Sequence, residues 1–401
     1  MRSIRAAAMA ACLLLALLPA VAPAASALSS EAAPEAAAPC SKPYLVEREF
    51  KNGARWSLCW EMREIEGLTL TKVVYTPRGH KPVSVLRSGH LAQIHVPYDS
   101  GEPRFQDMAG GLGSSVVPLQ TQDCPEGERR VQDDIPMFCV LPDQARGLAY
   151  LRPSLGEESL RASVQGKELV VFSAFEIGWY TYLVEWRFAD DGSITPRVGA
   201  TGSLRGSDGI VVSPKHGWPI GVGSSDFEES HSHNIFWRLD FDIQGPKDDA
   251  VEQFDFTGSG TAKRVMKTTA LAKEASAKND RTRWWRVVDK TVKNADDHPA
   301  SWEINNSDSA EYRGPASEKF SQADVYVTQY RKCERLASEN AEPPCKGAVN
   351  QYVNGQTITD PVVWVSVDFH HVARDEDQDP MPTHWQGFHV APRDITAKNP
   401  H

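Results

Sequence analysis

The sequence has no excess of basic residues: 43 Lys and Arg stand against 53 Asp and Glu, which gives a formal net charge of −10. Phosphate binding needs clustered cations, so this balance argues against a nucleic-acid partner. Beyond the extreme N-terminus no apolar run approaches the roughly 20 residues that span a bilayer, so no membrane span is expected. A phosphate-cradling loop, an internal repeat and a CxxC metal motif are absent as well.

What the chain does contain is typical of a globular protein with a large core. Of its 401 residues, 41% are hydrophobic, and 11 are tryptophan. From residue 44 onwards, short apolar runs are separated by Gly, Pro, Asn and Asp at intervals of roughly ten residues, which predicts β-strands. No shift in composition divides the chain, so we predict an all-β fold, one large antiparallel β-sandwich. The predicted strands include 68–75, 91–96, 169–175, 180–188, 235–243 and 362–369.

One pair of predicted strands forms a hairpin. Alternate residues from Tyr182 to Phe188 are large and apolar and therefore share one face of a strand. Asp-Asp-Gly at 190–192 then turns the chain into a second strand over 193–199. Residues 266–277 fit either a short helix or a polar connection.

The N-terminus has the pattern of an export signal. Arg2 and Arg5 precede an apolar stretch over 10–20, and Ala-Ser-Ala at 25–27 offers small residues for cleavage. An N-terminal anchor helix is the alternative, but prolines interrupt the apolar run early. Removal of the segment lowers the net charge from −10 to −12.

This pattern sets the predicted domain organisation. Residues 1–27 are a signal peptide, 28–40 a flexible leader rich in Ala, Pro, Ser and Glu, and 41–401 a single β-sandwich domain. The mature protein is expected to be secreted or periplasmic.

The cysteines fit an exported protein. Cleavage removes Cys12 and leaves six, and an even number in an oxidising compartment favours disulfides. Six cysteines allow many connectivities, so pairing between sequence neighbours is a preference only, and free buried thiols are the alternative. The neighbouring pairs are Cys40 with Cys59, Cys124 with Cys139, and Cys333 with Cys345.

Two histidines carry the strongest chemical signal. His231 and His233 lie at i and i+2 of a predicted strand, so both imidazoles can reach one metal ion. Imidazole suits copper, zinc, iron and nickel, and the spacing does not choose among them. A period of two over the strand ending at His371 places that histidine on the face of its apolar neighbours, while His370 points away with Asp368. His371 is therefore the candidate third ligand; surface histidines are the alternative.

Three carboxylates suggest a second cation site. Asp240 and Asp242 are again at i and i+2 on the strand that follows the histidine pair, and Asp360 precedes the strand that carries His371. With backbone carbonyls they would make a hard-oxygen site suited to calcium. Taken singly, each aspartate also fits a solvated strand end.

The order of several motifs resembles the catalytic domain of the copper amine oxidases, the quinone-containing enzymes. Each motif is short, but together they run through nearly all of the chain after residue 56. They are Glu-Gly-Leu-Thr-Leu at 66–70, Val-Pro-Tyr at 96–98, Ile-Gly-Trp-Tyr-Thr-Tyr at 177–182, His-Ser-His at 231–233, Asp-Pro-Val-Val-Trp at 360–364 and His-Val-Ala-Arg-Asp-Glu-Asp at 371–377.

The resemblance implies a function and a set of site residues. It implies an exported enzyme that oxidises a small primary amine with dioxygen to an aldehyde, hydrogen peroxide and ammonia. His231, His233 and His371 match the copper ligands, and Tyr180 matches the tyrosine that becomes topaquinone. Asp107 is similar to the general base, and Tyr98 to the tyrosine that hydrogen-bonds the quinone oxygen. The resemblance further implies a Cys124–Cys139 disulfide, calcium bound by Asp240, Asp242, Asp360 and the carbonyls of Phe241 and Pro361, and a homodimer.

The chain departs from the family around the quinone tyrosine. The family has Asn before this tyrosine and an acid after it, whereas this chain has Trp179 and Thr181. The acidic continuation after the base is replaced by Ala-Gly-Gly at 109–111. A copper-binding protein of the same fold without quinone or oxidase activity is therefore the alternative function, and zinc at the same histidines is a further one. The other histidines, His384 among them, are expected at surface or packing positions.

Overall fold

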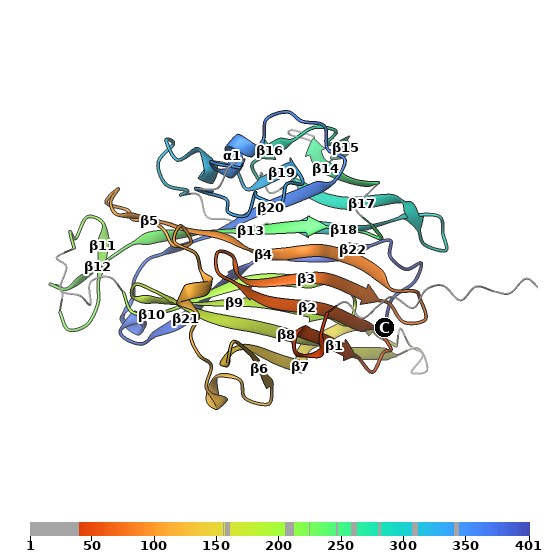
Figure 1. Cartoon of the computed structure of the whole chain (residues 1–401), viewed down its shortest axis with the longest axis horizontal. Helices are drawn as coiled ribbons and strands as arrows, with labels where there is room; N and C mark the ends of the chain where they lie inside the picture. The colour runs from red at the N-terminus through yellow and green to blue at the C-terminus, as the bar shows by residue number, and fades with distance from the viewer. Residues whose placement is uncertain are drawn as a thin grey trace, which may run out of the picture. The chain divides into compact units, whose positions relative to one another are not determined.

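Two large antiparallel sheets form the fold, and their inner faces enclose the main core (Figure 1). The computed structural model describes residues 40–154, 156, 161–204, 212–223, 225–245, 248–257, 263–279, 282–306, 312–340 and 345–401. The predicted signal peptide (1–27) and all of the predicted leader (28–40) except Cys40 lie outside these residues. No helix in the described ranges is long and apolar enough to cross a membrane.

The first sheet has nine strands in the described residues. Its central strands are β4, β13 and β20, and β13 and β20 carry the three candidate histidine ligands. In spatial order the strands are β1 (Leu45–Glu49), β2 (Arg55–Arg63), β3 (Gly67–Thr76), β4 (Val83–Pro97), β13 (His231–Phe241), β20 (Pro361–His371), β19 (Val325–Gln329) and β16 (Ala275–Ala277), with β5 (Arg104–Gln106) paired to β4.

The second sheet has eleven strands in the same ranges, and β9 carries Tyr180. The order is β15 (Val265–Ala270), β14 (Asp249–Thr257), β17 (Trp284–Lys293), β18 (Pro299–Asn305), β22 (His389–Arg393), β10 (Ile194–Gly202), β9 (Tyr180–Ala189), β8 (Ala162–Ile177), β7 (Ile135–Arg152) and β6 (Glu128–Gln132); β21 (Met381–Gly387) also pairs with β10. A small ribbon of β11 (Gly217–Pro219) and β12 (Phe227–Glu229) and one short helix, α1 (Val349–Tyr352), complete the elements that concern us.

The predicted all-β sandwich is confirmed, as is the hairpin, formed by β9 and β10 in register from Tyr180–Gly202 to Phe188–Ile194. The helical interpretation of 266–277 is wrong. Residues of β15 pair with β14, and β16 pairs with β19. Strands remote in sequence thus satisfy this backbone, which local polarity could not reveal.

Tryptophans from both sheets fill the space between them. Trp56 and Trp237 come from the first sheet and Trp186 from the second, and all three are fully buried. The ring of Trp186 meets that of Trp237 edge-on at 5.0 Å between centroids. Large rigid rings that interdigitate in this way bury much apolar area and fix how the two sheets lie against each other.

A second layer covers the outer face of the first sheet. Phe236 of β13 and Trp364 of β20 pack there against Phe320, Val349 and Tyr352. Every residue of β13 is buried as a result. Coverage on both faces explains how a strand can begin with His-Ser-His and still lie in the protein interior.

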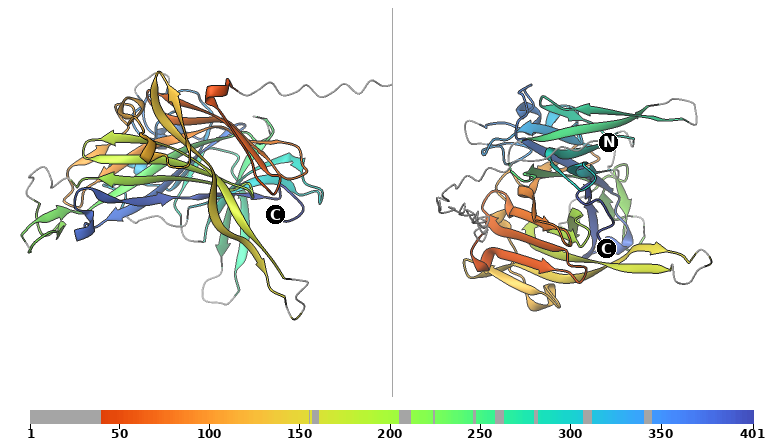
Figure 2. Two further views of the ribbon diagram at one scale, coloured as in Figure 1. Left: turned by 90° about the horizontal axis from the view of Figure 1, so that it is seen from below. Right: turned by 90° about the vertical axis from the view of Figure 1, so that its right-hand side faces the viewer.

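Two long hairpins, β7–β8 and β14–β15, extend from the sandwich as arms (Figure 2). Both carry exposed apolar side chains, among them Leu148 at 57% and Val265 at 66% exposure. Disulfides join Cys40 to Cys59, Cys124 to Cys139, and Cys333 to Cys345, so the preferred local pairing is confirmed.

Replacing Gly89 by alanine should destabilise the sandwich. A Cβ at Gly89 in β4 would lie 2.7 Å from the ring of Trp186, which is fully buried in the core. Overpacking of this kind costs about 1–3 kcal/mol of unfolding free energy, measurable by chemical denaturation. Gly110→Ala is the control, because a Cβ there meets nothing within 4 Å. Equal stability of the two variants would contradict this account of the core.

Candidate active site

Three histidines converge at one end of the central strands. β13 and β20 pair with His231 opposite His371 and His233 opposite Phe369. Residues directly opposite in an antiparallel pair project to the same face, so the register brings His371 beside the His-x-His pair. One nitrogen from each of the three imidazoles lies within 4.8 Å of the others, and all three residues are buried. His370 points away, as predicted, and contacts Asp99 at 2.9 Å.

Tyr180 reaches this cluster from the opposite sheet. Its hydroxyl lies 2.8 Å from His231 Nε2 and 3.1 Å from His371 Nδ1. The residue opens β9 after a tight turn in which Gly178 has φ of +61°, and Ile177 pairs with Tyr180 across that turn. Glycine adopts this left-handed conformation without strain, which allows a two-residue connection. The site therefore lies between the sheets, with ligand candidates on one and the phenol on the other.

The protonation states suit a metal ion. Burial holds the pKa of His231 down to about 3 and the pKa values of His233 and His371 below their usual range, so the imidazoles are neutral at pH 7. His231 Nδ1 lies 2.9 Å from the Glu229 carbonyl oxygen. Donation by that nitrogen leaves Nε2 unprotonated, and this nitrogen lies 2.8 Å from the Tyr180 hydroxyl and 3.1 Å from His233 Nε2. Three neutral nitrogens that face one another fit copper or zinc.

Asp377 and His384 support His371 from behind. His371 Nε2 lies 3.1 Å from Asp377 Oδ2, and the other oxygen of that buried carboxylate contacts His384 Nε2 at 2.9 Å. A carboxylate at Nε2 fixes the tautomer that presents Nδ1 towards Tyr180. The expectation that His384 has only a surface or packing position missed this contact, and no spacing rule points to it.

A cavity of about 220 Å³ lies on the other side of Tyr180. Asp107 and Tyr98 line it together with Tyr180, so the three residues assigned to catalysis by resemblance meet here. Tyr182 donates a hydrogen bond of 2.8 Å to Asp107 Oδ2. Removal from water nevertheless raises the pKa of Asp107 to about 7, while the Tyr182 hydrogen bond opposes that rise. A carboxylate with such a pKa can accept a proton near neutral pH.

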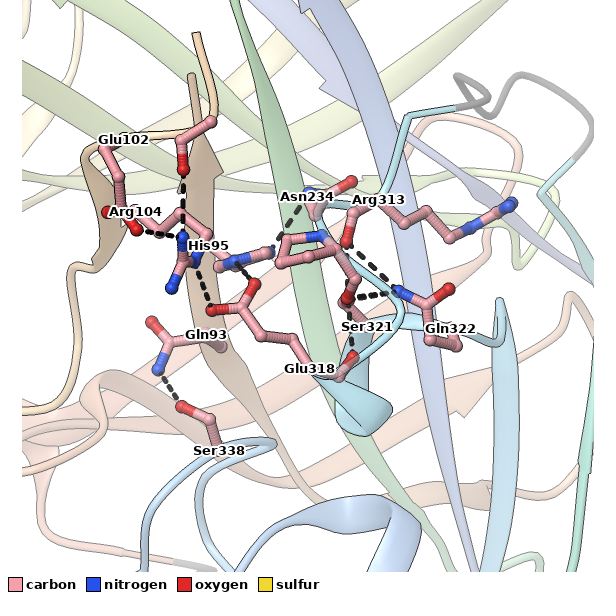
Figure 3. A network of polar contacts seen from close by, with 12 residues as sticks. Gln93, His95, Glu102, Arg104, Asn234, Arg313, Glu318, Ser321, Gln322 and Ser338 are labelled. Carbon is pink, nitrogen blue, oxygen red and sulfur yellow. Dashed lines mark hydrogen bonds and ion pairs between the residues drawn. The ribbon is translucent and has the colours of Figure 1, made fainter. Parts of the chain in front are cut away.

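Backbone contacts hold Asp107 against β4. Its amide donates to the Ile94 carbonyl at 2.9 Å, and the next amide, that of Met108, donates to Gln93 Oε1 at 3.0 Å. Gln93 is fully buried and also donates to Ser338 Oγ at 2.5 Å (Figure 3). These hydrogen bonds therefore fix the backbone that carries Asp107, the predicted base.

An ionic network secures the preceding strand, β5. Arg104 of β5 donates to Glu318 Oε1 at 3.0 Å, and the other carboxylate oxygen lies 2.8 Å from Nε2 of the fully buried His95 (Figure 3). Glu318 belongs to the segment that covers the outer face of the first sheet. Three remote parts of the chain thus meet behind the cavity.

Two of the aspartates predicted to bind calcium contact an arginine. Arg87 donates to Asp240 at 2.6 and 2.9 Å and to Asp360 at 2.9 and 3.0 Å. With Asp242, these carboxylates do not bring three ligand oxygens within 4.8 Å of one another. The carbonyls of Phe241 and Pro361 belong to the adjoining strand ends. A guanidinium already supplies the positive charge, which the aspartate spacing alone could not show.

Replacing Arg87 by methionine should lower the unfolding free energy by about 2 kcal/mol, because Asp240 is 1% exposed and would keep only the more distant Arg238, at 3.9 Å, as a cation. This loss of unfolding free energy is smaller than for a fully buried ion pair, because Arg87 is 29% exposed and water screens its charge. Without Arg87 the pKa of Asp360 should rise further. The difference in unfolding free energy between the variant and the unmodified protein should therefore become smaller as pH falls towards 5. Arg55→Met, which breaks the exposed pair with Glu47, is the control. Stabilisation of the unmodified protein by added calcium would refute the role given to Arg87.

Comparisons with known proteins agree with this geometry. Residues 137–401 match the family model described as "Copper amine oxidase, enzyme domain". Primary amine oxidase 2 of Arabidopsis thaliana is 27% identical over 89% of this chain, and the primary amine oxidase of Arthrobacter sp. (strain P1) is 27% identical over 86%. The chain spans 59% of the length of each of these relatives.

Solved structures show the same fold. The copper-containing benzylamine oxidase from Hansenula polymorpha superimposes with a TM-score of 0.69 at 20% identity, over 86% of this chain and 59% of that one. Lysyl oxidase from Pichia pastoris superimposes with a TM-score of 0.68 at 17% identity, over 86% of this chain and 51% of that one. The family model covers well over half of the chain, and the matched residues include the three clustered histidines. The protein therefore belongs to the copper amine oxidase family.

Proposed function

We propose that this protein is a copper-dependent oxidase of primary amines that uses a quinone formed from Tyr180. The position of the Tyr180 hydroxyl carries the proposal: it lies within 3.1 Å of two histidines of the cluster, while the same residue lines the cavity that holds Asp107. One tyrosine is thus shared by a metal-binding cluster and a substrate-sized space. The hydroxyl of the neighbouring Tyr182 lies 3.4 Å from Nδ1 of His233 and donates to Asp107.

His231, His233 and His371 would hold the copper, with Asp377 fixing the ring of His371. When bound, copper and the tyrosine-derived quinone supply oxidation of the amine to an aldehyde and the transfer of its electrons to dioxygen, with release of hydrogen peroxide and ammonia.

Residues of the cavity would transfer the substrate proton, position the reacting groups and exclude water. Asp107 removes the proton from the carbon next to the amine nitrogen, and its raised pKa suits that task near pH 7. Tyr98 is fully buried, stacks on His231 at 4.7 Å between centroids and lines the cavity with Tyr180, so it would hydrogen-bond the quinone oxygen. The apolar walls exclude water from the reacting atoms.

Export and dimer formation are part of the proposal. Three disulfides and the N-terminal sequence pattern support a secreted or periplasmic protein. The apolar side chains on the two arms support a homodimer, because exposed Leu148, Leu151, Val265 and Met266 would gain by burial against a second chain.

Addition of Cu(II) in air to metal-free protein tests the function. Visible quinone absorbance and a mass increase confined to the Tyr180 peptide are the expected results. Copper bound at one equivalent with Tyr180 unmodified would refute the oxidase and leave the alternative, a copper-binding protein without quinone. Absence of a copper EPR signal from protein that retains zinc would favour the other alternative, a zinc site at the same three histidines.

A further inference from the structure

The imidazole of His371 makes polar contacts on both of its edges. Its Nδ1 lies 3.1 Å from the Tyr180 hydroxyl, on the side of the three-histidine cluster. Its Nε2 lies 3.1 Å from Asp377 Oδ2, and the other oxygen of that carboxylate lies 2.9 Å from His384 Nε2. One ligand atom from each of His371, Asp377 and His384 lies within 4.8 Å of the other two, as in the three-histidine cluster. Two groups of candidate metal ligands therefore share one histidine.

The fold brings the second group together where the chain passes from one sheet to the other. His371 ends β20 in the first sheet, Asp377 ends the short 3-10 helix over 375–377, and His384 lies on β21, which pairs with β10 of the second sheet. The backbone amide of Arg374 donates to Asp377 Oδ2 at 3.1 Å. The carboxylate is thus held between two imidazoles by its own turn.

Burial and ligand type at this second group suit a divalent cation. The side chain of Asp377 is fully buried and that of His371 is 3% exposed, whereas that of His384 is 21% exposed. A buried carboxylate needs a cation or several hydrogen-bond donors to offset its loss of hydration. Two imidazoles and one carboxylate are a common ligand set for zinc, with water in the fourth position. The partial exposure of His384 gives the ion and this water access from solvent.

We propose that His371, Asp377 and His384 form a second metal site, the outer site, which takes zinc and is joined by the ring of His371 to the metal of the three-histidine cluster. The zinc ion replaces the hydrogen on His371 Nε2, and the proton passes to solvent water. A metal ion already bound at Nδ1 favours this release, because its charge withdraws electron density from the ring. His384 coordinates as a neutral imidazole with its hydrogen on Nδ1. The Asp377 carboxylate and the His371 imidazolate together balance the two charges of zinc.

Metal analysis of the full chain tests the outer site. Metal-free protein loaded with one equivalent of Cu(II) and then given a small excess of Zn(II) should retain one zinc per chain in addition to copper. His384→Ala should keep the copper but bind zinc at least about tenfold more weakly. His389→Ala is the control, because His389 is also half-buried but contacts Thr195 instead. Copper without zinc in the unmodified chain, or equal zinc binding by His384→Ala, would overturn the proposal.

A variant without the inner ligands separates this inference from the proposed function. Replacing both His231 and His233 by alanine removes two imidazoles of the three-histidine cluster and leaves the outer ligands in place. This full-length variant should still bind one Zn(II), and the further change His384→Ala should abolish that binding. Such a result supports the outer site even if the unmodified protein oxidises no amine. Failure of the folded double variant to bind zinc would overturn it, and the copper–zinc measurement above decides if the variant does not fold.

The EPR spectrum of the bound copper tests whether His371 is shared. Zinc in the outer site should shift this spectrum in the unmodified chain, because the ring that binds copper through Nδ1 then carries a second cation on Nε2. The spectrum of His384→Ala should not change on addition of zinc. Zinc binding that leaves the copper spectrum of the unmodified chain unchanged would contradict a bridging histidine.

The affinity for zinc should also respond to a neighbouring charge. Arg374 Nε lies 3.5 Å from Asp377 Oδ1, and its side chain is 55% exposed, so the guanidinium competes with a bound ion but can move into solvent. Arg374→Gln should therefore tighten zinc binding by about two- to fivefold, the scale of an exposed ion pair. Isothermal titration of the copper-loaded chain measures this change, and weaker zinc binding by the variant would count against Asp377 as a ligand.

Discussion

Replacement of Tyr180 by phenylalanine should abolish peroxide release from primary amines while copper still binds at one equivalent. The ring and its packing against Tyr182, at 5.6 Å between centroids, are retained, so the loss would belong to the hydroxyl alone. That oxygen is the group that meets His231 Nε2 and His371 Nδ1. Peroxide assays with copper analysis and intact-protein mass measurement check the prediction.

The control for this variant is another buried tyrosine. Tyr326 donates to the Phe320 carbonyl at 2.7 Å in the outer layer of the first sheet, away from the histidine cluster. Tyr326→Phe should lose some stability but keep its turnover. Turnover by Tyr180→Phe would show that the quinone does not come from this residue.

Asp107→Asn should lower kcat by about 10²- to 10⁴-fold, the usual contribution of a general base. The amide keeps the size of the carboxylate and can still accept the Tyr182 hydrogen bond, but it cannot take up the substrate proton. Quinone absorbance should persist in the variant, since Asp107 touches none of the three histidines. A kcat close to that of the unmodified protein would remove Asp107 from the mechanism.

The pH dependence of kcat/KM offers a second readout of Asp107. Its activity as a base requires the deprotonated form, so the rate should rise with pH with a midpoint near the raised pKa of about 7. Tyr182→Phe removes the hydrogen bond that holds this pKa down, and should move the midpoint upward. A downward shift would contradict the assignment.

The same Asp107 carboxyl group makes the stability of the protein fall as pH rises, whereas it makes the rate rise. Its folded pKa of about 7 lies above the unfolded value of about 4, so the folded state holds the proton more tightly and loses stability as pH rises between the two values. Asp107→Asn lacks this loss. Its stability relative to the unmodified protein should therefore increase from pH 4 to pH 7, measured by denaturant unfolding, and a flat difference would place the pKa elsewhere.

Much of the fold could be predicted because it depends on local patterns. The alternation from Tyr182 to Phe188 reflects one buried face of β9, and Asp-Asp-Gly at 190–192 makes the turn to β10. Residues 266–277 were misread as a possible helix for the converse reason. Their strands β15 and β16 exist only through partners remote in sequence, β14 and β19, and carry no apolar alternation of their own.

The site was predictable in part. His231 and His233 share a face because the strand period is two, and the same period made His371 a candidate third ligand. Family resemblance added Tyr180. Asp377 and His384 were missed as supports of His371, since their contacts arise where the chain folds back after β20. Arg87 was missed because nothing in its neighbourhood of β4 shows that Asp240 and Asp360 lie beside it.

By itself the sequence determined the acidic, cysteine-paired β-sandwich and one face of a metal site, because the pleat of a strand sets the direction of every second side chain. The tertiary structure alone decided the rest. The register of β13 on β20 placed His371 opposite His231, and packing of the two sheets brought Tyr180 into the cluster. Such contacts depend on which strands pair and how sheets stack, and a lone strand carries no record of its neighbours.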